Sequence, residues 1–321
     1  MRKIFYLLTI TPFLAHAAYT VKEGKLVNTE EVATLSVQEH YSAALNAYQK
    51  KKWDELVQQA RIVKLNFAAT PFAQEALFYL GVGYFHQEEY ELANQEFSVY
   101  LKKQTAPKHF EEAIEYKFAI AEKYQKGAKK PLLGWQNMPK WVPAVEDALQ
   151  IYDEVIMALP HHELGAKALY GKARLLFKDE EYKASIDTYQ TLVRRFPKHA
   201  FAVQSYLGMG EVYLAQCQKQ YPDPDFLDLA EINLRKFKQD FPQDEKIALG
   251  EKMLMEMQEI YASHLYETAQ FFERTHKPHA SIIYYTKVLS NYPLTKCASL
   301  AKKRLLVLQP DTVSPSEETV R

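Results

Sequence analysis

The chain has 321 residues, of which 47% are hydrophobic and 13% aromatic; this is enough for a continuous core and excludes global disorder. Its 40 lysines and arginines balance 40 aspartates and glutamates, so it lacks the electrostatic footprint of a nucleic-acid-binding protein. Only 10 glycines occur, fewer than a turn-rich all-β protein needs.

The N-terminus has the three regions of a secretory signal peptide. Residues 2–3 are basic, residues 4–14 are apolar, and residues 15–17 form a small-x-small cleavage site. We therefore predict a signal peptide over 1–17 and an exported protein, with an ordinary buried helix as the alternative. The apolar run is too short to span a bilayer, and no later stretch is long and uncharged enough. Residues 18–36 are polar and without period, which predicts a flexible lead.

Helical periodicity starts near Val37 and continues to Leu308. It divides into segments in which two amphipathic helices are separated by a short break, as in a helical hairpin. The expected hairpins span about 37–71, 76–101, 110–160, 168–197, 200–242 and 264–293.

Four segments share one spacing, in which a small residue is followed by bulky residues after four and eleven positions and then by proline. The copies are Ala148-Tyr152-Leu159-Pro160, Ser185-Tyr189-Phe196-Pro197, Ala230-Leu234-Phe241-Pro242 and Ser281-Tyr285-Tyr292-Pro293. Steps of four and seven place the first three residues on one helix face, and the proline marks the helix end. Recurrence at this pitch favours stacked hairpins, so we predict an all-α, right-handed α-solenoid of about six hairpins over residues 37–308.

A second internal match joins the segments 79–83 and 206–210, which read Tyr-Leu-Gly-Val-Gly and Tyr-Leu-Gly-Met-Gly. Glycine inside a helix costs about 1 kcal/mol relative to alanine, so it needs a compensating reason. We expect that reason to be close approach of the two helices of one hairpin.

A loop insertion near 127–143 interrupts the third hairpin and carries Leu133, Trp135 and Trp141. Long loops without a pattern of their own are usually functional, and exposed tryptophan is typical of binding hot spots. These three residues are therefore candidates for partner binding. The alternative is that both tryptophans seal a gap between repeats.

Tyrosines on the first helices of the hairpins are the other candidates for partner binding. They are Tyr79, Tyr84, Tyr170 and Tyr206. A peptide on the concave face of the stack would gain affinity from the rings and direction from the hydroxyl groups. Most of the 22 tyrosines must nevertheless be ordinary packing.

Near the C-terminus, Met253, Met255 and Met257 favour a core-filling role over an apolar binding surface. The segment 294–308 reads as a capping helix with an apolar inner side and lysines outside. Residues 309–321 are expected to form a disordered tail.

The sequence contains no recognisable catalytic motif: there is no phosphate-binding glycine loop, nucleophile elbow or metalloprotease helix. The histidine groups at 161–163 and 276–279 fall at expected turns and do not supply four convergent ligands. Cys217 and Cys297 lie in different hairpins, and whether they pair is left open. We therefore expect no catalytic, cofactor or metal site and no enzyme activity.

The repeated spacing resembles the tetratricopeptide repeat, and its arrangement resembles the BamD family, outer-membrane lipoproteins of the Gram-negative β-barrel assembly machine. The segments that carry the resemblance are 152–156, 265–266, 280–282, 287–289 and 291–293. Family members carry a lipidated cysteine, whereas this chain has Ala17-Ala18, so membrane association is expected only through a partner.

The resemblance implies a periplasmic scaffold at the inner face of the outer membrane. Its expected partners are the barrel-forming subunit of the assembly machine and unfolded outer-membrane clients. One alternative is a repeat protein that coordinates cell-envelope or peptidoglycan machinery. An alternative of another class is an envelope hydrolase, although the acid–base or nucleophile set that it would need is missing.

Overall fold

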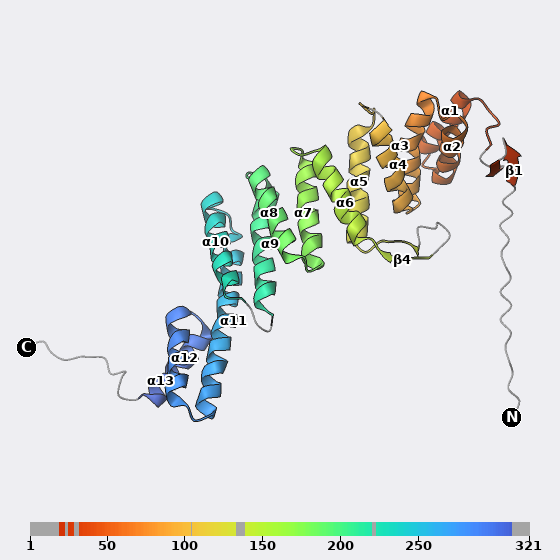
Figure 1. Ribbon diagram of the computed structural model, residues 1–321. Helices are drawn as coiled ribbons and strands as arrows, with labels where there is room; N and C mark the ends of the chain where they lie inside the picture. Colours follow the sequence, from red (N-terminus) through yellow and green to blue (C-terminus); the bar gives the residue numbers. More distant parts are fainter. Residues whose placement is uncertain are drawn as a thin grey trace, which may run out of the picture. The chain divides into compact units, whose positions relative to one another are not determined.

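The computed structural model describes residues 19–22, 25–28, 32–103, 105–132, 139–219 and 223–309 (Figure 1). The predicted signal peptide and almost all of the predicted tail lie outside these residues. The chain divides into two compact units, residues 1–144 and 145–321. Among the described helices, none combines the length and the hydrophobicity that a bilayer crossing requires.

The first unit contains five helices and two small antiparallel sheets within its described residues. Its elements are β1 (Tyr19–Lys22), β2 (Lys25–Asn28), α1 (Val37–Gln49), α2 (Trp53–Asn66), α3 (Pro71–His86), α4 (Tyr90–Lys103), α5 (Phe110–Gln125), β3 (Lys129–Pro131) and β4 (Lys140–Pro143). Each of α1 to α4 packs against the helix that follows it. The β1–β2 pair lies in the predicted flexible lead and the β3–β4 pair in the loop insertion, where the polar composition indicated no strands.

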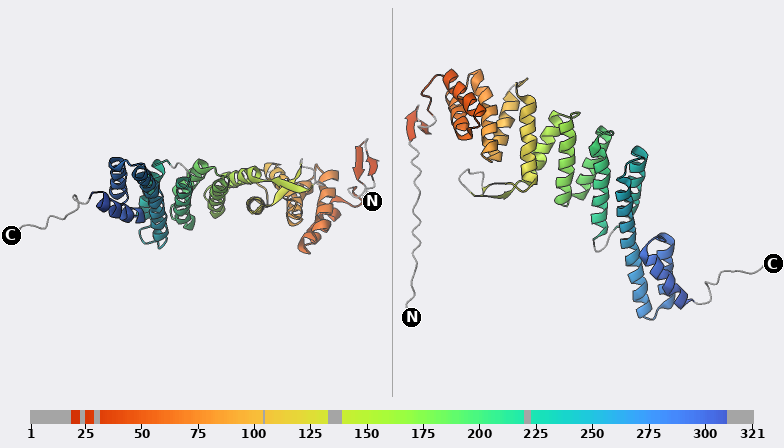
Figure 2. Two further views of the ribbon diagram at one scale, coloured as in Figure 1. Left: turned by 90° about the horizontal axis from the view of Figure 1, so that it is seen from below. Right: turned by 180° about the vertical axis from the view of Figure 1, so that it is seen from behind.

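The second unit is helical throughout its described residues. Its elements are α6 (Val145–Ala158), α7 (Glu163–Lys178), α8 (Tyr182–Arg195), α9 (Ala200–Cys217), α10 (Asp225–Asp240), α11 (Ile247–Arg274), α12 (Pro278–Asn291) and α13 (Lys296–Leu308). Consecutive helices pack side by side as hairpins, which all the views of this unit show (Figures 1 and 2). The architecture is therefore all-α and built from stacked tetratricopeptide-like hairpins, as the spacing predicted.

Helices end where the repeated prolines predicted. The helices α6, α8, α10 and α12 each stop one or two residues before the proline of their repeat. Several helices begin at a side-chain cap that satisfies an otherwise unpaired backbone N–H group. His162 belongs to one of the histidine groups noted in the sequence, and its Nδ1 accepts a hydrogen bond from the N–H of Leu164 at 3.1 Å. His199 caps α9 in the same way, through the N–H of Phe201 at 3.2 Å.

In five of the described turns, the segment that follows the first helix of a predicted hairpin contains one residue in the left-handed conformation. This residue is Lys51, Glu88, Glu180 or His276, with φ between +56° and +62°, and Gly127 takes the same place after α5 with φ +104°. Only glycine adopts this conformation at little steric cost. Four of the five turns are thus made by charged or imidazole side chains, which the sequence pattern did not indicate.

The repeat spacing corresponds to a specific contact between hairpins. A Cβ atom on Gly208 of α9 would lie 2.5 Å from the Tyr189 ring of α8, and one on Gly171 of α7 would lie 2.8 Å from the Tyr152 ring of α6. The bulky residue of the repeat therefore fills the space that a glycine of the next hairpin leaves open. The expected close approach within one hairpin occurs at Gly81, which faces Phe97, but Gly83 and Gly208 instead face residues of the preceding hairpin.

The helix α11 differs from the prediction. The methionine segment and the first helix of the last hairpin were expected as separate elements, but they form one helix of 28 residues. Met257 is buried, as a core-filling role requires, whereas Met255 is exposed. No proline or glycine pair interrupts residues 251–274, so nothing in the backbone chemistry ends the helix between the two segments.

The capping helix α13 is only partly as predicted. Its inner side, Ala298, Ala301 and Leu305, is buried. Its outer side carries lysines but also exposes Leu300 and Val307, so it is less polar than the end of a stack was expected to be.

Candidate protein-binding groove

The long helix α11 contributes to two separate cores. Its first half packs with α9 and α10 in a cluster that contains Met257 and Tyr261, and its second half packs with α12 and α13 in a cluster that contains Ala262 and Ala269. The last hairpin is thus displaced along α11 from the preceding one. Part of the α11–α12 face is left without a covering hairpin.

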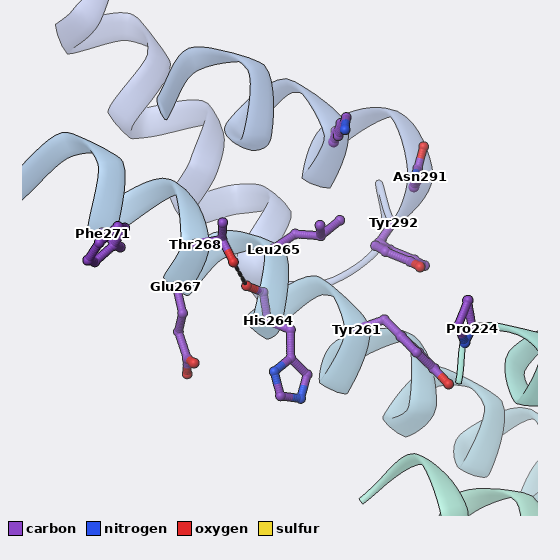
Figure 3. Close-up of a pocket in the computed structure, with 10 residues that line it drawn as sticks. Pro224, Tyr261, His264, Leu265, Glu267, Thr268, Phe271, Asn291 and Tyr292 are labelled. Carbon is purple, nitrogen blue, oxygen red and sulfur yellow. Dashed lines mark hydrogen bonds between the residues drawn. The ribbon is translucent and has the colours of Figure 1, made fainter. Parts of the chain in front are cut away.

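A groove of about 910 Å³ occupies this uncovered face (Figure 3). Its lining comes from α11, the end of α12 and the segment that leads into α10. The lining residues are Pro224, Tyr261, His264, Leu265, Glu267, Thr268, Phe271, Lys287, Asn291 and Tyr292. The α11 residues recur every three or four positions and so lie on one helix face.

The inner end of the groove is fixed by Tyr261. Its hydroxyl group donates a hydrogen bond to the backbone carbonyl of Asp223 at 2.5 Å, and it lies 3.5 Å from the Cys217 sulfur. Burial and the neighbouring thiol raise the pKa of Tyr261 well above its ordinary value, so the phenol stays protonated and can donate. The Tyr261 ring also stacks on the Tyr292 ring, with centroids 6.5 Å apart. These contacts hold Pro224 and Tyr292 in place beside the groove.

The outer end of the groove is apolar and open. Phe271 is 54% exposed although it is aromatic and lies within a helix. The exposed side chains of His264 and Glu267 project beside the groove (Figure 3), Lys287 of α12 also lines it, and no hydrogen bond joins these three described residues. The arrangement offers an aromatic surface with a polar margin, which suits the apolar face of a partner peptide or helix.

The imidazole, carboxylate and ammonium groups of the groove are all exposed. Burial raises the pKa of the buried Tyr261 and of the half-buried Tyr292, so both phenols remain protonated. Within the described chain, no three histidine, cysteine or acidic side chains cluster as metal ligands would. Both cysteines are free thiols, with Cys217 buried in α9 and Cys297 half-buried in α13.

The predicted contact tyrosines lie mostly in the interior. Tyr79, Tyr84 and Tyr206 are 5%, 8% and 5% exposed and contribute to hairpin packing. Tyr170 is half-buried and stacks on Phe201, with centroids 4.9 Å apart. Little of these rings is exposed in the free chain, although Tyr206 also lines a groove on α8, α9 and α10.

In the insertion, Trp141 lies on β4 and is 66% exposed, so this tryptophan does not seal a gap between repeats. The strand is held against the α3–α4 turn by Lys140, whose Nζ donates to the Glu88 carbonyl at 2.9 Å and to Glu89 Oε1 at 2.8 Å. The other two candidates in the insertion, Leu133 and Trp135, lie outside the described residues.

The sequence did not predict the groove on α11. Phe271 and Leu265 fit the helical period of a core as well as that of a surface. A usable signal was the Phe271-Phe272 pair, because adjacent positions on a helix point in different directions and both cannot face one core.

A sequence profile of the YfiO family, described as outer membrane lipoprotein, matches residues 142–309, a little more than half of the chain. Among solved structures, the chain is similar to MamA from Desulfovibrio magneticus, with 16% identity, 65% of this chain and 97% of that chain covered, and a TM-score of 0.37. It is also similar to a tetratricopeptide repeat protein from Parabacteroides merdae, with 14% identity, coverage of 85% and 98%, and a TM-score of 0.37. No curated protein sequence matches the chain significantly.

Proposed function

The chain belongs to the YfiO family of outer membrane lipoproteins, and from this membership we propose that it is a periplasmic scaffold for the assembly of outer-membrane β-barrel proteins. In this role it binds protein partners and catalyses no reaction. The partners are the barrel-forming subunit of the assembly machine and, at other surfaces, unfolded client chains. The site of action is the inner face of the outer membrane.

One observation carries the proposal: the region that matches the family contains an open aromatic groove that the stack itself leaves uncovered. Hairpin proteins bury apolar faces by stacking one pair on the next. An uncovered face at 264–271 is therefore a position where a helix or strand of another protein continues the stack. Phe271 would contribute most to affinity, since aromatic side chains dominate the energy of protein interfaces.

The mechanism is geometric. The groove lies on a helix that is packed into two cores, so its backbone is ordered before a partner binds. A preformed surface avoids much of the entropy loss that ordering a loop would impose on association. Folded hairpins can therefore hold several partners in fixed relative positions.

Site-specific photocrosslinking in the organism that encodes the chain tests this proposal. A photoreactive amino acid at position 271 should capture the barrel-forming subunit, identified by mass spectrometry. Ile283 gives a matched control, because it lies on the adjacent helix α12, is 56% exposed and does not line the groove. The same photoreactive residue at position 283 should give little of this product.

Depletion of the protein gives the second measurement. We expect outer-membrane β-barrel proteins to fall in abundance, and a chain with Phe271→Glu to restore them less well than one with Ile283→Glu. Equal crosslinking at both positions would remove the groove from the proposal. Unchanged barrel proteins together with a cell-wall defect would instead favour a role in peptidoglycan machinery.

A further inference from the structure

A second groove, separate from the first, lies on α8, α9 and α10 and has a volume of about 390 Å³. Its floor consists of buried side chains of α9, among them Met209 and Tyr213. One wall is formed by α10, where Leu229 and Ile232 are each 42% exposed. The buried core side of α10 is made by other residues, so these two apolar side chains are left partly exposed at the edge of the groove.

The groove follows the helical period. On α10 the lining positions are 229, 232, 233 and 236, and on α8 they are 190, 193 and 194. Spacings of three and four place each set on a single face. The two faces look onto the same floor, so the groove is a continuous channel between two neighbouring second helices of hairpins.

The charged side chains that line this groove are both positive. Arg194 ends the α8 wall and Lys236 ends the α10 wall, and both are exposed. Neither forms an ion pair with any described residue, and Arg194 makes only a 3.5 Å contact with the hydroxyl of Thr191. Their charges are therefore available to a ligand.

Two carboxylates lie close to the groove but not in its lining. Asp240 already accepts a hydrogen bond from the hydroxyl of Tyr206 at 2.5 Å. Asp187 lies near enough to Tyr213 to help raise the pKa of that phenol, after burial, which is the larger cause. The amide of Asn233 is held by the Tyr206 carbonyl at 2.9 Å. The charged residues in the lining itself are thus both cationic, with the Asp187 carboxylate nearby but outside the lining.

We propose that this groove binds an acidic peptide segment of a protein partner, with its apolar side chains between Leu229 and Ile232 and its carboxylates at Arg194 and Lys236. An apolar floor disfavours nucleic acid, which would need a track of cations and stacking surfaces. A channel between helices accepts one chain, whereas a bilayer surface requires a protruding basic or apolar face. This binding goes beyond barrel assembly and holds whichever partner presents the segment.

Fluorescence anisotropy of the full chain tests the proposal with two labelled synthetic peptides. In the acidic probe, glutamates alternate with leucine and phenylalanine; in the matched probe, lysines replace the glutamates. The acidic probe should bind at least about tenfold more tightly, and its affinity should fall as salt is added, because rim charges are screened.

Charge reversal at the rim identifies the site. The double variant Arg194→Glu and Lys236→Glu should weaken binding of the acidic probe about tenfold or more. Arg195→Glu is the matched control, since this residue neighbours Arg194 and is exposed but does not line the groove. Leu229→Ser should weaken binding without changing its salt dependence, and circular dichroism should show all variants folded.

Three results would overturn the proposal. The first is equal binding of the two probes, or equal loss in the Arg195→Glu control. The second is binding to phosphatidylglycerol vesicles that the double variant abolishes while the acidic probe does not bind, which would assign the cations to lipid. The third is a change in self-association in the double variant without any effect on the probe, which would assign the groove to a second copy of the chain.

Discussion

Packing of Tyr189 against Gly208 predicts how this stack responds to one added methyl group. In Gly208→Ala, the new Cβ would lie 2.5 Å from Cζ and 2.7 Å from Oη of Tyr189. Ordinary contact begins near 3.4 Å, so the ring or the helix must move by roughly 0.9 Å. Tyr189 is 1% exposed, which leaves the ring little space for this movement.

The magnitude follows from two opposing effects. Overpacking a well-packed core costs about 1–3 kcal/mol. Replacing a helical glycine by alanine returns about 1 kcal/mol of helix propensity. We therefore expect Gly208→Ala to lower the free energy of unfolding by up to about 2 kcal/mol, measured by urea denaturation with circular dichroism.

A matched control lies two residues further along the same helix. In Gly210→Ala, the new Cβ would meet only the flexible side chain of Met253, whose sulfur is 3.3 Å away. This variant should gain up to about 1 kcal/mol from propensity. Combining Gly208→Ala with Tyr189→Leu should recover part of the loss, as expected for residues in direct contact. Equal stability of the two single alanine variants would refute the proposed close contact between hairpins.

Three further predictions concern other parts of the chain. Trp141→Ala should reduce capture of a protein partner in pull-down experiments but leave the melting temperature unchanged, because the ring is 66% exposed; a lower melting temperature with normal capture would refute a contact role. Asn94→Ala should destabilise the protein by about 1–3 kcal/mol more than Lys117→Met does, measured by urea denaturation. The Asn94 variant keeps the buried Lys117 ammonium but removes the acceptor that lies 2.6 Å from it. Glu259→Gln should reduce stability at neutral pH: burial opposes ionisation, but backbone N–H donors at the start of α13 hold the Glu259 pKa below 4.5. The wild-type advantage should therefore be full above about pH 4.5 and disappear as the pH falls through the lower folded pKa, and a constant difference across this range would contradict it.

The hairpins were predictable because their cause is local. A small residue at 185 and a bulky one at 189 lie one helical turn apart, and the proline at 197 ends the helix whatever surrounds it. The sequence thus specifies the second helix of each repeat almost by itself. Tyr189, on the shared helix face that the spacing predicted, is buried in the stack.

The grooves were not predictable because they depend on how neighbouring hairpins are offset. Leu229 and Leu234 of α10 are identical in side chain and lie five positions apart on different helix faces, yet the first is 42% exposed and the second 7%. The difference in exposure depends on which face of α10 is covered by α8 and α9. The sequence of α10 alone does not show which face that is. Tyr206 depends on the same offset: it is mostly buried and its hydroxyl donates to Asp240, yet it also lines the groove on α8, α9 and α10.

The length of α11 connects the fold with the proposed function. Had the helix ended before Tyr261, the last hairpin could have stacked directly on α10 and covered its own aromatic face. Because α11 continues for 28 residues, the last hairpin is displaced and Phe271 is left exposed. Large apolar side chains on a soluble surface cost solubility unless a partner covers them. Because α11 is continuous, the last hairpin does not cover its own aromatic face. That face can be covered only by another molecule.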